Sequence, residues 1–234
     1  MSLKRVFVTY RLPEDILRPL RGICDLEVWT GTKPMTPPEL FSSICDSDGI
    51  ICLLTDEITR SLLENQEKLN FISSMSVGVD HIDLAAATNK NIPVGNTPGV
   101  LAETTADLAF GLLIAAARRI PEADKFVREG QWMSDMPWSP DFFLGKDVYD
   151  ATLGVVGLGE TGKAVARRGK AFGMRVLGWN RTQKDVEDVE LVTLDELLAE
   201  SDYVSIHIAR TSETLLFFDH ERIMSMKKGA ILIN

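Results

Sequence analysis

Residues 153–182 read LGVVGLGETGKAVARRGKAFGMRVLGWNRT, an apolar strand, a glycine-rich turn, a helix and a second apolar strand. The turn has the spacing Gly157-x-Gly159-x-x-Gly162. In such a turn the first glycine permits the tight bend, the second lets the backbone approach a pyrophosphate, and the third lets the helix pack on the strand. The helix N-terminus adds N–H groups and the positive end of a dipole. The pattern predicts dinucleotide binding, and a glycine turn that binds nothing is the alternative.

The second strand ends at Asn180, which is followed by Arg181 and Thr182. A carboxylate at this place would accept hydrogen bonds from a ribose 2′-hydroxyl and would repel a 2′-phosphate. Asn180 removes that repulsion, and the Arg181 guanidinium and the Thr182 hydroxyl suit a phosphate. We therefore predict NADP(H) as the preferred cofactor, with NAD(H) as the alternative if Arg181 is only a solvated turn residue.

The N-terminal hundred residues alternate short β-branched runs with helix-like segments. Strands are expected at RVFVTY (5–10), DLEVW (25–29), GIICLL (49–54), FISSMSVG (71–78) and IPVGNT (92–97). This rhythm is typical of a parallel sheet covered by helices on both faces. It breaks near Pro98 and Gly99, where a long helical stretch begins that should be kinked or broken near Pro121. A second β-α-β series begins after Asp150, so we predict an α/β fold with two domains, residues 1–98 and 99–234.

Composition excludes several classes of protein. A net charge of −9 and a pI near 4.9 argue against a nucleic-acid partner. The longest apolar run, residues 106–120, is shorter than the ~20 residues that a membrane span needs, and no signal-peptide pattern precedes the first strand. The 3 cysteines lack metal or redox spacing, as expected for reduced thiols. We predict a cytoplasmic protein with no metal site and no membrane partner.

Longer segments carry a resemblance to a known family. They are residues 74–119 (SMSVGVDHIDLAAATNKNIPVGNTPGVLAETTADLAFGLLIAAARR), 143–159 (FLGKDVYDATLGVVGLG), 201–214 (SDYVSIHIARTSET) and 226–234 (MKKGAILIN). With GLGETG and WNRT they resemble the D-isomer-specific 2-hydroxyacid dehydrogenases, and within them the glyoxylate/hydroxypyruvate reductases. The resemblance implies two Rossmann-like or flavodoxin-like parallel-sheet domains with an active-site cleft between them. The first would contact substrate, and the second would bind the nucleotide and form a homodimer.

The same resemblance assigns roles to individual residues. The backbone N–H groups of Val77 and Gly78 would hold the substrate carboxylate, and Leu54 would form an apolar lip beside it. The alternative for Gly78 is a plain turn glycine, and the alternative for Leu54 is an ordinary core leucine. Thr105 matches a position near the nicotinamide, with a helix-surface or core threonine as the alternative. The cofactor-binding set is Thr105, Gly157, Gly159, Glu160, Thr161, Gly162, Asn180, Arg181, Thr182, Ile208 and Ala209.

The chain departs from the family pattern in three places. Glu160 and Thr161 replace the usual Arg-Ile of the glycine turn, and Arg210 stands where a leucine is typical. The family's catalytic arginine, glutamate and acid/base histidine come after the strand matched by AILIN, so they are expected beyond Asn234. We therefore assign no catalytic residue within this sequence, which looks truncated at its C-terminus and leaves the second domain incomplete. None of the 3 histidines is expected to be the acid/base group: the family often has a non-catalytic histidine at the place of His81, His207 is interpreted as structural, and His220 as exposed or capping.

The implied reaction is the transfer of a hydride from NADPH to the carbonyl carbon of a small 2-keto acid, such as glyoxylate or hydroxypyruvate, giving the D-2-hydroxy acid. The partners implied are that acid and, in the full-length protein, a second copy of the chain. The alternative is a non-catalytic dinucleotide-binding regulator or a truncated paralogue of the same fold. The presence or absence of the three catalytic residues in the complete chain would separate these hypotheses.

Overall fold

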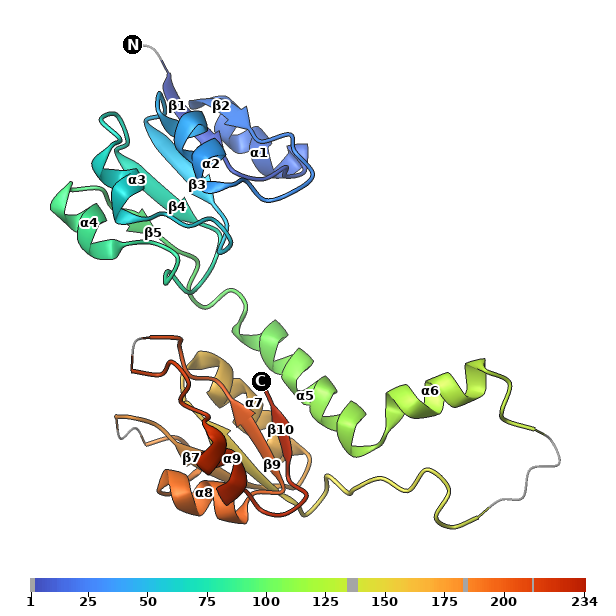
Figure 1. Ribbon diagram of the computed structural model, residues 1–234. Coiled ribbons are helices and arrows are strands. Elements are labelled where there is room, and N and C mark those ends of the chain that lie inside the picture. Colours follow the sequence, from blue (N-terminus) through green and yellow to red (C-terminus); the bar gives the residue numbers. More distant parts are fainter. Residues whose placement is uncertain (1–2, 134–138, 183–184, 212) are drawn as a thin grey trace. The chain divides into compact units, whose positions relative to one another are not determined.

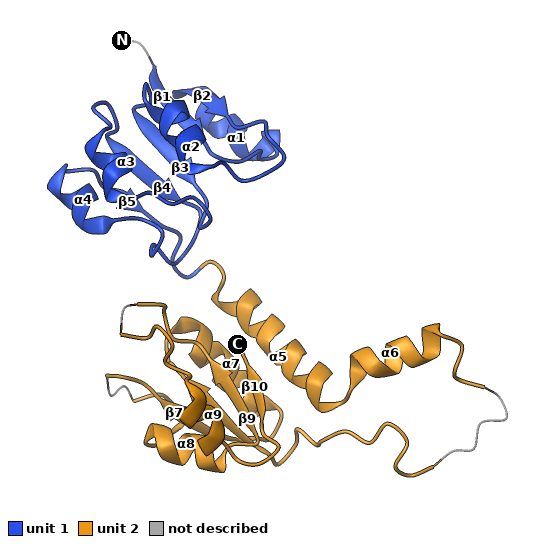
Figure 2. Ribbon diagram, in the orientation of Figure 1, with its two compact units in different colours: residues 1–99 blue, residues 100–234 orange. Residues whose placement is uncertain are grey.

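The computed structural model describes residues 3–133, 139–182, 185–211 and 213–234. It divides into two compact units, Met1–Gly99 and Val100–Asn234, which are coloured separately in Figure 2. Each unit contains its own parallel sheet of 5 strands, so the predicted α/β fold class is confirmed (Figure 1).

Unit 1 alternates strands and helices along the whole of its length. Its elements are β1 (Lys4–Val8), α1 (Glu14–Arg21), β2 (Cys24–Val28), α2 (Pro37–Ile44), β3 (Gly49–Cys52), α3 (Arg60–Glu64), β4 (Phe71–Ser74), α4 (Leu84–Asn89) and β5 (Val94–Gly95). The strand order is β2-β1-β3-β4-β5 and all pairs are parallel. This is the flavodoxin-like order of a doubly wound sheet, in which ligands bind beyond the carboxyl ends of the strands.

Local chemistry explains where the helices of unit 1 begin. Thr59 accepts a hydrogen bond from the Leu62 N–H (3.3 Å) and Asp83 accepts one from the Ala86 N–H (2.8 Å), each satisfying a donor that the helix itself cannot. The C-terminus of α3 is held by the Lys90 ammonium, which donates to the carbonyls of Leu63 (2.8 Å) and Gln66 (2.6 Å). Because Lys90 is the C-cap of α4, its bonds join the C-termini of α3 and α4.

Unit 2 begins with two helices and continues with the second sheet. Its elements are α5 (Ala102–Ala117), α6 (Ile120–Arg128), β6 (Thr152–Val156), α7 (Glu160–Ala171), β7 (Arg175–Trp179), β8 (Glu190–Leu191), α8 (Leu194–Glu200), β9 (Tyr203–Ile206), α9 (His220–Ser225) and β10 (Ile231–Ile233). The strand order β10-β9-β6-β7-β8 is the Rossmann order 3-2-1-4-5 read from the far edge. The glycine-rich turn therefore follows the central strand.

The long helical stretch is broken, as expected, although the break comes before the proline. Helix α5 ends at Ala117, and Arg119 has a positive φ of 55°. Pro121 then lies in the first turn of α6, where its missing N–H costs no helical hydrogen bond. The left-handed residue, rather than the proline, redirects the chain.

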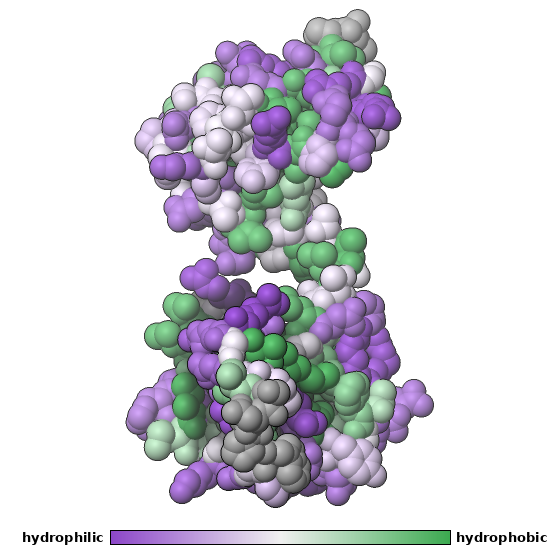
Figure 3. All heavy atoms as spheres, turned by 90° about the vertical axis from the view of Figure 1, so that its right-hand side faces the viewer, coloured by the Kyte–Doolittle hydropathy of each residue, from purple (hydrophilic) through white to green (hydrophobic). Residues whose placement is uncertain are grey.

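Helix α5 packs one face into the core of unit 2 and leaves large apolar side chains exposed elsewhere. Ala106, Phe110 and Leu113 are buried in the same cluster as the β6 residues Leu153 and Val155. Figure 3 shows hydrophobic residues at the surface of unit 2. The exposed large apolar residues of α5, α6 and the segments that follow include Leu108, Leu112, Val127, Trp132 and Leu144. None of the helices in the described ranges combines the length and apolar character needed to cross a bilayer.

Candidate functional site

The glycine-rich turn lies between β6 and α7 and is fixed by its neighbours on both sides. Gly157 has a φ of 98°, a conformation that side chains disfavour. Its N–H donates to the Trp179 carbonyl at the end of β7 (2.8 Å), and a Cβ there would lie 2.7 Å from the His207 carbonyl group after β9. Only glycine fits this position.

The other two glycines of the turn differ from each other. A Cβ on Gly162 would overlap with the carbonyl oxygen of Gly157, so this glycine is needed for α7 to approach the turn. A Cβ on Gly159 would meet no atom within 4 Å. Gly159 is the N-cap of α7, whose first N–H groups have no acceptor inside the helix. An anion such as a pyrophosphate fits at this open, positively polarised end.

Glu160 and Thr161 open α7, and Glu160 does not oppose an anion at the turn. The Glu160 side chain is 76% exposed, and Lys163 Nζ lies 3.5 Å from its carboxylate. Thr161 is half-buried in the first turn of the helix. Because Glu160 replaces the family's usual arginine, a negative charge lies on the solvent side of α7, where Lys163 compensates it.

Asn180 connects the glycine-rich turn to the residues that follow β7. Its Oδ1 accepts a hydrogen bond from the Leu158 N–H (3.1 Å), and its Nδ2 donates to the Thr182 carbonyl (2.7 Å). The amide therefore fixes the 180–182 segment beside the turn, a role that an aspartate could fill only in part because it has no N–H to donate.

Arg181 forms an ion pair with Glu213, which lies in the segment after β9. Both side chains are largely exposed, 72% and 69%. An exposed pair of this kind contributes little to stability, because water screens the charges. The Arg181 guanidinium has five N–H donors, so a phosphate can bind beside Glu213 or displace it.

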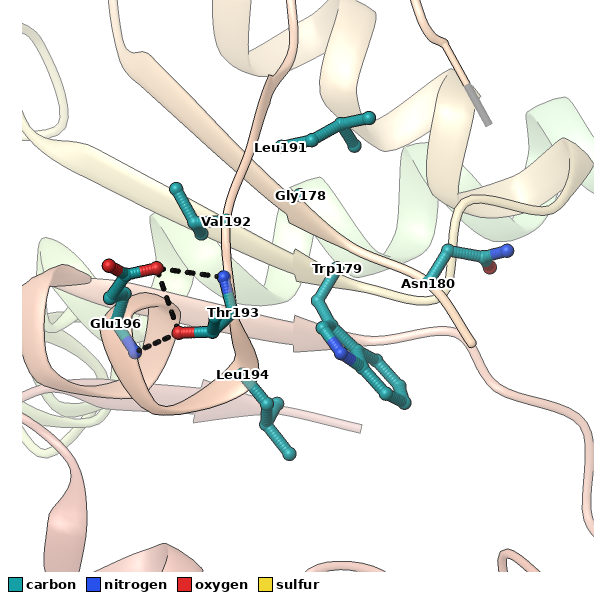
Figure 4. Close-up of a pocket in the computed structure, with 8 residues that line it drawn as sticks. All are labelled: Gly178, Trp179, Asn180, Leu191, Val192, Thr193, Leu194 and Glu196. Atoms are coloured by element: carbon teal, nitrogen blue, oxygen red, sulfur yellow. Dashed lines mark hydrogen bonds between the residues drawn. The ribbon is translucent and has the colours of Figure 1, made fainter. Parts of the chain in front are cut away.

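Two pockets flank the ends of β7 and β9. The first, of about 420 Å³, is lined by Gly178, Trp179, Asn180, Leu191, Val192, Thr193, Leu194 and Glu196 (Figure 4). The figure shows the Thr193–Glu196 capping hydrogen bonds of α8 on the side opposite Asn180. The second pocket, also about 420 Å³, includes Ile208 and Ala209. The Trp179 ring stacks on Phe217 of the second pocket, with ring centroids 5.3 Å apart.

The structure thus brings most of the predicted cofactor residues together at the carboxyl end of one sheet. Gly157, Asn180 and Ile208 come from three neighbouring strand ends and meet around the same turn. Thr105 is exposed in the first turn of α5. Its helix is tied to α7 by Arg168, which pairs with Glu103 (3.0 Å) and with Asp107.

The predicted substrate residues lie in unit 1, at the ends of the adjacent strands β3 and β4. Val77 and Gly78 are exposed in the loop after β4. Leu54 follows β3 and is 65% exposed, so the alternative of a core leucine is wrong. Gly78 has no positive φ, so it is not a glycine that the turn itself requires. Val77 and Gly78, whose N–H groups are predicted to bind the substrate carboxylate, are both accessible to solvent.

The histidines occupy structural positions. His81 Nε2 lies 3.1 Å from Ser74 Oγ and His207 Nε2 lies 2.8 Å from Ser205 Oγ. Burial lowers the pKa of both imidazoles, which favours their neutral forms. His220 is the exposed first residue of α9. Within the residues that the structure describes, no three His, Cys, Asp or Glu side chains converge as a metal site.

Sequence reasoning missed several contacts of these sites. They are the hydrogen bonds from Asn96 to the Val77 carbonyl and from Ser76 to the Gly78 carbonyl, the Arg181–Glu213 ion pair, and the Trp179–Phe217 stack. Asn96 and Glu213 lie 19 and 32 positions from their partners. No local pattern of residues signals such pairs, and only the short spacing of Ser76 and Gly78 could have indicated a side chain-to-backbone bond.

Comparison with known proteins agrees with this arrangement. The family described as D-isomer specific 2-hydroxyacid dehydrogenase, NAD binding domain, matches residues 110–234. A glyoxylate reductase of Korarchaeum cryptofilum (strain OPF8) is 46% identical over 234 residues, which cover 98% of this chain and 70% of the relative.

Two solved structures extend the likeness to cofactor complexes. An acyclic imino acid reductase in complex with NADPH and D-Arg is 28% identical, with a TM-score of 0.87 and coverage of 97% of this chain and 73% of that one. A D-lactate dehydrogenase of Aquifex aeolicus, complexed with NAD and lactic acid, is 29% identical, with a TM-score of 0.82 and coverage of 97% and 67%.

Proposed function

The chain belongs to the D-isomer-specific 2-hydroxyacid dehydrogenases, and on that premise we propose that it reduces glyoxylate or hydroxypyruvate to the corresponding 2-hydroxy acid with NADPH, with D configuration in the chiral product of hydroxypyruvate. The family match confirms the resemblance read from the sequence, the enzyme class and a nicotinamide dinucleotide as cofactor. The choice of dinucleotide and of keto acid is the part that we propose.

The observation that carries the nucleotide assignment is the contrast among the glycines of the turn. Gly157 and Gly162 are glycines because the protein's own backbone crowds them, whereas nothing in the described chain crowds Gly159. A bound pyrophosphate at the α7 N-terminus explains the need for glycine there. Thr161, Ile208 and Ala209 would line the path of the nucleotide, with Thr105 near the nicotinamide. When bound, the nicotinamide supplies the hydride chemistry.

The preference for NADPH is supported by the residues after β7. Asn180 uses its amide to hold the 180–182 segment and places no carboxylate beside the ribose. Arg181 and Thr182 would then bind the 2′-phosphate, and Glu213 would compete with that phosphate for the guanidinium. The carboxylate of Glu213 thus opposes the preference that Arg181 creates.

The small 2-keto acid would bind through the loop after β4. Val77 and Gly78 would present backbone N–H groups to its carboxylate, and exposed Leu54 would limit the space for its side chain. His81 and His207 are engaged with serines, so we assign the proton that the developing alkoxide needs to neither of them.

We also propose a homodimer in the cytoplasm. The exposed Leu108, Leu112 and Val127 on α5 and α6 offer apolar area for a second copy of the chain. The cysteines Cys24, Cys45 and Cys52 are all free, which agrees with a reducing compartment.

Steady-state reduction of glyoxylate and hydroxypyruvate with NADPH and with NADH tests the proposal in the full-length protein. Arg181→Ala should raise the Kd of NADPH by roughly tenfold or more, because a charge-assisted hydrogen bond is lost, and should change that of NADH by about twofold at most. Glu213→Gln is the matched control, since it frees the same guanidinium and should tighten NADPH binding. Equal effects of Arg181→Ala on both dinucleotides would contradict the 2′-phosphate assignment.

A further inference from the structure

Three consecutive carbonyl groups of the loop after β4 each accept a hydrogen bond from a different donor. The Ser76 carbonyl accepts from the Thr97 N–H (3.0 Å) and the Val77 carbonyl from Asn96 Nδ2 (2.9 Å). The Gly78 carbonyl accepts from Ser76 Oγ (2.6 Å). The three peptide units from Ser76 to Val79 are therefore held at their carbonyl ends.

Holding the carbonyls also fixes the direction of the N–H groups. A trans peptide is planar, and its C=O and N–H point in opposite directions. No cis peptide occurs in the described chain. The bond at the Ser76 carbonyl therefore orients the Val77 N–H, and the bond at the Val77 carbonyl orients the Gly78 N–H. Both are the N–H groups that would bind the substrate carboxylate.

The Ser76 hydroxyl, which donates to the Gly78 carbonyl, is the last donor in a series of hydrogen bonds that all run in one direction. The Gly78 carbonyl can only accept, so Ser76 donates to it, and Ser74 must donate to Ser76 in turn (2.7 Å between the hydroxyl oxygens). Ser74 then accepts from His81 Nε2 (3.1 Å). Ser74 and Ser76 are 1% and 6% exposed, so water does not replace these bonds easily. The donors therefore all point the same way, from the His81 imidazole toward the Gly78 carbonyl.

We propose that Asn96 is a positioning residue for the carboxylate of the 2-keto acid, because its bond to the Val77 carbonyl fixes the Val77–Gly78 peptide plane and hence the Gly78 N–H. The Ser76 hydroxyl holds the next peptide, Gly78–Val79, and so supports the same loop. The inference rests on the proposed function and adds a side chain that does not itself touch the substrate. Asn96 reaches the loop from the segment after β5 (Val94–Gly95), so two neighbouring strand ends share the task.

Asn96→Ala is the first test, because Asn96 is exposed and its loss should leave the fold intact. In the full-length protein with saturating NADPH, the KM for glyoxylate should rise roughly 5- to 10-fold, since one hydrogen bond that orders the site is lost. The kcat should change less than about twofold and the Kd of NADPH should not change. Asn96→Gln keeps the donor and should recover part of the loss.

Asn65→Ala is the matched control. Asn65 is another exposed asparagine of unit 1 that donates to a backbone carbonyl, that of Ser61 (2.7 Å), away from the loop. This variant should behave as the wild type. Ser76→Ala releases only the Gly78–Val79 peptide, so it should raise the KM less than Asn96→Ala, with some loss of melting temperature because a buried hydrogen-bonding partner is removed.

A second readout separates this inference from the proposed activity. Amide NMR of Val77 and Gly78 during a glyoxylate titration should show shifts in the wild type that need about ten times more glyoxylate in Asn96→Ala. A wild-type KM and a wild-type titration in Asn96→Ala would overturn the positioning role and leave the activity standing. Shifts that weaken in the variant, without turnover by the wild type, would overturn the activity and support the positioning role. Neither turnover nor shifts in the wild type would overturn both.

Discussion

The turn at Gly157–Gly162 and the loop at Met75–Gly78 follow parallel strands of different sheets and expose backbone N–H groups, yet they are held in different ways. The first is fixed chiefly by close packing, because the missing Cβ atoms of Gly157 and Gly162 let backbone meet backbone, and one side chain, Asn180, accepts from the Leu158 N–H. The second is fixed by side chains, because Asn96 and Ser76 donate to successive carbonyls. Backbone anion sites can therefore be built by removing atoms or by adding hydrogen bonds.

The largest effect should come from breaking the packed turn. Gly162→Ala would force a Cβ against the Gly157 carbonyl, which can relieve the overlap only if α7 shifts. We expect a loss of about 1–3 kcal/mol in the free energy of unfolding, as for other overpacked sites, measured by urea denaturation. Stability equal to the wild type would mean that the turn is not held by packing.

Gly159→Ala tests a glycine of the same turn that is not held by packing, in contrast to Gly162. The new Cβ has open space around it, so the urea midpoint should stay at the wild-type value. The Kd of NADPH should rise roughly tenfold or more, because the methyl group occupies the place of the pyrophosphate. A tightly bound nucleotide in this variant would count against the pyrophosphate site, whereas a lower midpoint would show that Gly159 is a structural glycine.

The smallest effect should come from the histidines that lie near both regions. Burial lowers the pKa of His81 and of His207 below the ordinary value of 6.5, with Asp80 and Asp56 opposing the shift at His81. Between pH 6.5 and the lower folded-state pKa, the unfolded chain binds more protons than the folded one. Their contribution to stability is therefore complete above pH 6.5 and is lost as the pH falls.

His207→Gln tests this dependence, since the glutamine amide can still form a hydrogen bond with Ser205 and does not titrate. Urea midpoints measured between pH 7.5 and pH 5.5 should fall less steeply in the variant than in the wild type. Identical slopes would show that His207 is protonated as readily in the folded protein as in the unfolded chain.

The sequence was sufficient for the features that are local or periodic. The alternation of apolar runs and helices predicted two parallel sheets, and the spacing of Gly157, Gly159 and Gly162 marked the turn. The two-residue strand β8 carries too little pattern to be predicted, and the left-handed Arg119 has none. The contacts of Asn96 with Val77 and of Glu213 with Arg181 join residues far apart in the chain, so they depend on the completed fold.

The continuity of the first sheet has a consequence for synthesis on the ribosome. Its 5 strands come from one uninterrupted segment, from Lys4 in β1 to Gly95 in β5, and the described part of unit 2 contributes none. At a translation rate of roughly 5–20 residues per second, the residues of unit 2 follow over several seconds, far longer than a small domain needs to fold. The nascent chain can therefore bury the apolar core of unit 1 before the glycine-rich turn has been translated.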